Sequence, residues 1–109
     1  MLNSKQRAYL RGCANKEEPI FQVGKGGVGD PMVKSISDAL EARELIKISV
    51  LEIAGVTARE AADTISGMTG ADVVGVIGRR VILFRESSKK ENRKLSLEIR
   101  GLHGKSRTQ

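Results

Sequence analysis

The chain has 109 residues, of which 39% are hydrophobic but only three are aromatic, and it carries a formal net charge of +6. This size suits one domain with a modest, mainly aliphatic core, and the single cysteine excludes an internal disulfide. No apolar run approaches the roughly 18 residues of a membrane-spanning helix. The first residues also lack the apolar segment of a secretory signal, so we expect a cytoplasmic protein.

The positive charge is concentrated near the C-terminus. Residues 1–86 carry 12 lysines and arginines against 11 acidic residues, whereas residues 87–109 carry seven against two. We therefore predict one domain over 1–86 and a basic C-terminal extension over 87–109. Such an extension indicates a polyanionic partner, although a solvated, flexible end explains the last nine residues equally well.

A first helix is predicted to begin at Asn3, which caps it together with Gln6 in a capping box. Its buried side is expected to comprise Leu2, Tyr9, Leu10, Cys13 and Ala14. A short strand over 19–23 follows, because this segment is rich in β-branched and aromatic residues.

A second helix is predicted with Asp30 as its N-cap and Pro31 at its first position, both of which are favoured there. It runs to about residue 43, and the alternating segment 45–51 then reads as a strand.

The third helix has the clearest start, since Thr57 and Glu60 form another capping box. Gly70 is suited to end it.

Two further strands are predicted over 72–77 and 80–85, joined by Gly78 and Arg79 in a two-residue hairpin turn. Alternating apolar residues also indicate a short edge strand over 95–99. The order α-β-α-β-α-β-β predicts an α/β fold with a mixed four-stranded sheet packed with helices.

Gly24, Lys25, Gly26 and Gly27 form a glycine-rich loop between the first strand and the second helix. Without side-chain bulk the backbone N–H groups can approach a ligand closely, and the helix N-terminus adds partial positive charge. Together these features predict a phosphate site.

Three motifs compete for this loop. A Walker A motif lacks its lysine, because Asp30 stands in that place. A dinucleotide fingerprint matches Gly24, Gly26 and Gly29, with Glu52 as a ribose-binding carboxylate, but the chain is short for that fold. A GxxG clamp for nucleic-acid backbone fits best, while a tight turn that merely needs glycine remains an alternative.

Four separated blocks carry a resemblance to a known family. They are residues 4–11, 19–27, 39–48 and 76–85. In this order they closely resemble the YhbY-type CRM domain, the chloroplast RNA splicing and ribosome maturation module, in its bacterial stand-alone form. The resemblance covers about residues 2–86.

This resemblance implies an α/β sandwich similar to the C-terminal domain of translation initiation factor three. It also implies RNA binding and association with precursors of the large ribosomal subunit. The RNA-binding residues it points to are Lys5, Arg7 and Arg11 of the first helix, the loop Gly24, Lys25, Gly26 and Gly27, and Arg79 and Arg80 of the hairpin. One departure is Gly12-Cys13, where the family has bulkier residues, so the first helix is expected to be weaker there.

We add Lys34, one turn into the second helix, as a further candidate for RNA contact. We expect no enzyme, metal site or cofactor, because no paired carboxylates or metal-ligand spacings occur. The sequence thus predicts an RNA-binding ribosome assembly factor whose partner is structured RNA. The alternatives are a small nucleotide-binding protein that uses the same loop and a ribosome-bound protein-interaction adaptor.

Overall fold

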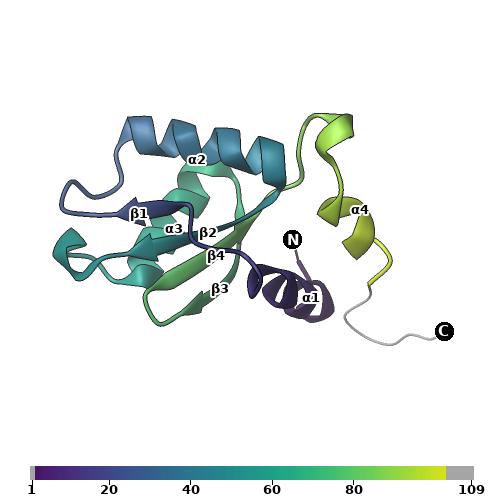
Figure 1. Cartoon of the computed structure of the whole chain (residues 1–109), viewed down its shortest axis with the longest axis horizontal. Coiled ribbons are helices and arrows are strands. Elements are labelled where there is room, and N and C mark those ends of the chain that lie inside the picture. The colour runs from purple at the N-terminus through teal and green to yellow at the C-terminus, as the bar shows by residue number, and fades with distance from the viewer. Residues whose placement is uncertain (1, 103–109) are drawn as a thin grey trace.

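The computed structural model describes residues 2–102 and confirms the predicted order of helices and strands (Figure 1). The elements are α1 (Ser4–Ala14), β1 (Phe21–Val23), α2 (Asp30–Arg43), β2 (Leu45–Val50), the 3-10 turn η1 (Glu52–Ala54), α3 (Ala58–Thr69), β3 (Asp72–Ile77), β4 (Arg80–Phe84), the 3-10 turn η2 (Lys90–Asn92) and α4 (Leu95–Ile99). The predicted flexible end lies mostly at 103–109, outside the described residues.

The four strands form one mixed sheet in the order β1-β2-β4-β3. β1 and β2 are parallel, and β4 is antiparallel to both of its neighbours. The predicted β3–β4 hairpin is confirmed, and Gly78 at its turn has a φ of +59°. β4 therefore lies between β2 and β3, which the order of elements along the chain does not specify.

Helices cover the two faces of the sheet unequally (Figure 1). On one face α2 and α3 pack along the strands over an aliphatic core that includes Ile46, Ile48 and Val50 of β2. On the other face α1 and α4 cover only one end, where Leu10 and Ile99 pack against Phe84. Since neighbouring strand residues point to opposite faces, Lys47, Ser49, Arg80 and Ile77 share the rest of this second face.

The predicted helix starts of α1 and α3 are confirmed. Asn3 and Gln6 exchange hydrogen bonds of 2.8 and 2.9 Å, and Thr57 and Glu60 form the same reciprocal pattern. α1 continues through Gly12 and Cys13 to Ala14 without a break.

The expectation that Tyr9 is buried is wrong, since 41% of its surface is exposed. Its hydroxyl donates a 2.6 Å hydrogen bond to Glu98, which raises the pKa of Tyr9 to about 12. A polar tip that needs a partner thus keeps the ring at the rim between α1 and α4.

The edge strand predicted over 95–99 is also wrong, because this segment forms α4. Leu95 and Ile99 are four residues apart, a spacing that suits one face of a helix as well as alternate positions of a strand. The residue between them, Leu97, is 52% exposed. The backbone N–H groups of Lys94 and Ser96 donate to the buried Glu44 carboxylate and hold the start of this helix.

Candidate nucleic-acid interface

The glycine-rich loop at 24–27 closes as a β-turn directly after β1. The backbone N–H of Gly27 donates to the Gly24 carbonyl at 2.9 Å, so that Lys25 and Gly26 occupy the two corners. Both corner residues are exposed. Within residues 2–102 the Lys25 ammonium forms no ion pair, and its charge is therefore available to an anion.

The fold requires only one of the three glycines in this turn. Gly27 has a φ of +70°, which favours glycine. Gly26 has no positive φ, and a Cβ built on it would meet nothing within 4 Å. A Cβ on Gly24 would meet only Leu51, at 4.0 Å. The backbone conformation therefore explains Gly27, whereas neither conformation nor packing requires glycine at positions 24 and 26.

The start of α2 differs from the prediction by one residue. The N-cap is Gly29, with φ −108° and ψ 172°, and Asp30 is already the first helical residue. No side chain caps this end, because Gly29 has none and the Asp30 carboxylate forms no capping bond. Exposed N–H groups and the helix dipole therefore attract an anion here, while the charge of Asp30 opposes it.

The basic side chains predicted on α1 lie apart from the loop. In Figure 1 the loop between β1 and α2 lies at one end of the sheet, and α1 lies at the other. Lys5 is exposed, whereas Arg7 reaches back to the Leu2 carbonyl at 3.4 Å. The stem of Arg11 lies against Gly75, 3.3 Å from where a Cβ would stand on that residue. The basic residues of α1 and the glycine-rich loop therefore do not form one site.

The other predicted contacts, Lys34 and the two hairpin arginines, lie outside both α1 and the glycine-rich loop. Lys34 is exposed on α2 and pairs with Asp38 at 3.3 Å. Arg79 is tied to the end of β2, since its Nε donates to the Val50 carbonyl at 2.7 Å. Arg80 is exposed and, among the described residues, forms neither an ion pair nor a side-chain hydrogen bond.

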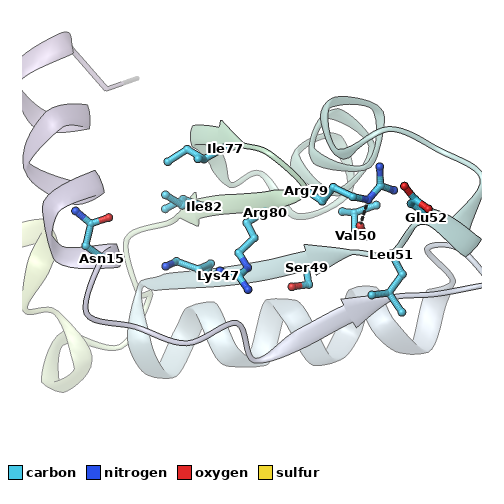
Figure 2. A pocket seen from close by; sticks show the side chains of 10 residues that line it. All are labelled: Asn15, Lys47, Ser49, Val50, Leu51, Glu52, Ile77, Arg79, Arg80 and Ile82. Carbon is cyan, nitrogen blue, oxygen red and sulfur yellow. Dashed lines mark hydrogen bonds between the residues drawn. The ribbon is translucent and has the colours of Figure 1, made fainter.

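A hollow of about 540 Å³ lies on the open part of the sheet, and Figure 2 shows the side chains around it. Arg79 and Arg80 reach it from the hairpin. Sequence reasoning missed Lys47 and Asn15, which also line it. The alternation of β2 had indicated a polar face for Lys47, but nothing in the sequence indicated which segments would lie beside that face.

Among residues 2–102 no group of three or more histidine, cysteine or acidic side chains is arranged to hold a metal ion. In the same part of the chain, no helix is both long and apolar enough to cross a bilayer.

Comparison with known proteins places the chain in a family. Residues 2–85 match the model of the CRS1 / YhbY (CRM) domain. A Bacillus subtilis protein named Probable RNA-binding protein YqeI is 45% identical over 97 residues, which cover 89% of this chain and 99% of the relative. A Haemophilus influenzae protein named RNA-binding protein is 31% identical over 86 residues, covering 79% of this chain and 87% of its own.

The fold has a counterpart among solved structures. The solution structure of the Staphylococcus aureus protein SAV1595 matches with a TM-score of 0.68 and 41% identity, over 86% of this chain and 98% of that one. Both the sequence match and this shared fold span nearly all of the described residues. The chain therefore belongs to the CRS1/YhbY family of CRM-domain proteins.

Proposed function

We propose that this protein binds structured RNA through its backbone phosphates, with the loop at 24–27 as the main contact. The observation that carries this proposal is that Gly24 and Gly26 lack side chains where the fold does not demand glycine. Beside them stand the exposed charge of Lys25 and the uncapped start of α2. Bare backbone, a cation and a helix N-terminus together suit a phosphate group.

The scarcity of aromatic side chains favours recognition of shape over reading of a single-stranded sequence. The chain has three aromatic residues, and Tyr9 is engaged with Glu98 at the end of the sheet away from the loop. Stacking of successive bases on aromatic side chains is the usual source of affinity for single strands. Recognition of an RNA helix rests instead on phosphates, 2′-hydroxyls and groove shape.

For the biological role we propose a non-enzymatic factor that acts in the cytoplasm on precursors of the large ribosomal subunit. Two relatives carry RNA binding in their names, and the CRM-domain resemblance supplies the link to ribosome maturation. The domain over 1–86 would make the specific contacts. The basic extension over 87–109, with seven cationic residues against two acidic ones, would add affinity for any polyanion.

The test is a charge reversal at the loop. Lys25→Asp combined with Gly26→Asp should weaken binding to transcribed large-subunit ribosomal RNA by at least about 30-fold, since charge-assisted hydrogen bonds are lost and phosphate is repelled. Gly26 tolerates this change because its φ is negative and the space around it is open.

Ala42→Asp combined with Arg43→Asp is the control, because these exposed positions take the same total change of charge at the far end of α2, about 20 Å away by helix length. Thermal melts establish that both variants are folded. Unchanged affinity in the folded double variant would contradict the loop as the binding site. Sequencing of RNA crosslinked to the protein in cells would identify the target.

A further inference from the structure

We infer that the hollow on the open sheet face binds a single unpaired nucleotide of the RNA whose backbone the glycine loop holds. The inference rests on the proposed function and deepens it, because it assigns a second contact and a feature of the RNA. Four features of the hollow support it: its open position on the sheet, its positive charge, its apolar lining residues and its connection to the loop.

The hollow is built on one row of the sheet. Ser49 of β2 pairs with Arg80 of β4, and Arg80 pairs with Ile77 of β3, so these three side chains project from the same face. Lys47 lies two residues before Ser49 and shares this face (Figure 2). α1 and α4 pack only over the other end of the face, around Phe84, and leave this row open.

The charge of the hollow is predominantly positive. Lys47, Arg79 and Arg80 line it against one carboxylate, Glu52. In the described part of the chain none of the three cations takes part in an ion pair. Arg79 is nevertheless fixed by its bond to the Val50 carbonyl. Unpaired cations held at a concave surface attract a phosphate.

Apolar side chains also line the hollow, which distinguishes it from a simple phosphate patch. Ile77, which is 57% exposed, lies near the buried Ile82 on one side, and Leu51, which is 37% exposed, lies on the other (Figure 2). A paired RNA helix presents phosphate and ribose to a protein and hides the faces of its bases. An unpaired nucleotide instead offers a flat apolar base next to its phosphate, which matches aliphatic side chains beside cations.

The hollow adjoins the glycine loop at Leu51. The Leu51 N–H donates to the Val23 carbonyl at 2.9 Å, directly before the loop. The Leu51 side chain comes within 4.0 Å of where a Cβ would stand on Gly24, and it also lines the hollow. One RNA can therefore place a backbone phosphate on the loop and a neighbouring base in the hollow.

The experiment compares two fluorescein-labelled RNA hairpins, one with a fully paired stem and one with a single unpaired uridine in the same stem. The natural protein should bind the bulged hairpin at least about tenfold more tightly. This is the gain expected from one charge-assisted hydrogen bond together with the contact between the base and the apolar side chains. Lys47→Gln combined with Ile77→Ser should bind both hairpins equally.

Met68→Ser combined with Arg59→Gln is the matched control, since it removes one charge and one half-exposed apolar side chain on α3, away from the hollow. Thiouridine at the bulge should crosslink to the hollow in the natural protein, which keeps the inference testable if the double variant does not fold. Equal binding of both hairpins, a preference that survives in the folded hollow variant, or crosslinks elsewhere would overturn the inference. Failure to bind either hairpin would instead overturn the proposed function itself.

Discussion

The Ser96 hydroxyl donates a 2.6 Å hydrogen bond to the carboxylate of Glu44, which is fully buried. The same carboxylate accepts from the backbone N–H groups of Ser87, Lys94 and Ser96, at 2.9, 2.9 and 3.1 Å. Within residues 2–102 no cation pairs with it, so neutral donors alone stabilise the buried charge. Glu44 thereby ties the segment after β4 to the end of α2.

Replacing Glu44 by glutamine should lower the free energy of unfolding by at least about 2 kcal/mol. The amide places an N–H donor among donors, leaving buried groups unpaired. Ser96→Ala removes only one of the four bonds and should cost about 1 kcal/mol. Urea titration followed by circular dichroism measures both values, and a Glu44→Gln variant as stable as the natural protein would contradict this account.

Glu44 should also make the fold sensitive to acid. Burial favours its neutral form, but the hydrogen bonds from Ser96, Ser87 and Lys94 outweigh burial and hold its pKa below the ordinary value of 4.5. Hydrogen bonds from Ser88, with a contribution from Arg85, lower the pKa of Glu41 in the same way.

A carboxylate whose pKa is lower in the folded state adds stability above its unfolded pKa and loses it as the pH falls through the folded pKa. The contribution of Glu41 and Glu44 to the free energy of unfolding should therefore be constant above about pH 4.5 and decline below it. Glu44→Gln should show a shallower decline. An equal slope in both proteins would show that Glu44 does not titrate in this range.

Two alanine variants should separate the structural from the binding role of the glycines. Gly27→Ala forces a side chain into a φ of +70° and should cost about 1–2 kcal/mol of stability. Gly26→Ala meets open space at an ordinary φ, so its melting temperature should match that of the natural protein. Its RNA affinity should nevertheless fall several-fold because the added methyl blocks backbone approach. Unchanged affinity would mean that the backbone of Gly26 does not contact RNA.

RNA binding should be strongly dependent on salt. With about four to six phosphate contacts, a plot of log K against log salt should have a slope of about −3 to −5. Lys25→Gln should reduce the magnitude of this slope by about one, since one contact is lost. A slope near zero with retained affinity would exclude binding led by phosphates.

Removing the negative charge at the start of α2 should strengthen RNA binding. Asp30 is exposed in the first turn and opposes a phosphate at the uncapped N-terminus. Asp30→Asn should tighten binding about two- to threefold while costing about 0.3–1 kcal/mol of helix stability. Asp63→Asn on α3 provides the control, because it removes the same charge from a surface pair with Arg59. Equal effects from both variants would point to net charge rather than to the loop.

The sequence by itself determined the local elements of this protein. Thr57 and Glu60 mark the start of α3, Gly78 marks the hairpin, and the alternation of 45–51 marks β2, because each signal acts between residues close together in the chain. The position of the glycine loop between a strand and a helix followed from the same local order.

Only the tertiary structure decided the remainder. The spacing of Leu95 and Ile99 fits a strand or a helix, and the buried carboxylate of Glu44, 52 residues before Ser96, selects the helix. Lys47 and Arg80 come to share an open face because β4 lies beside β2 rather than at the sheet edge. Such contacts join distant segments through packing and burial, which no short stretch of sequence can specify.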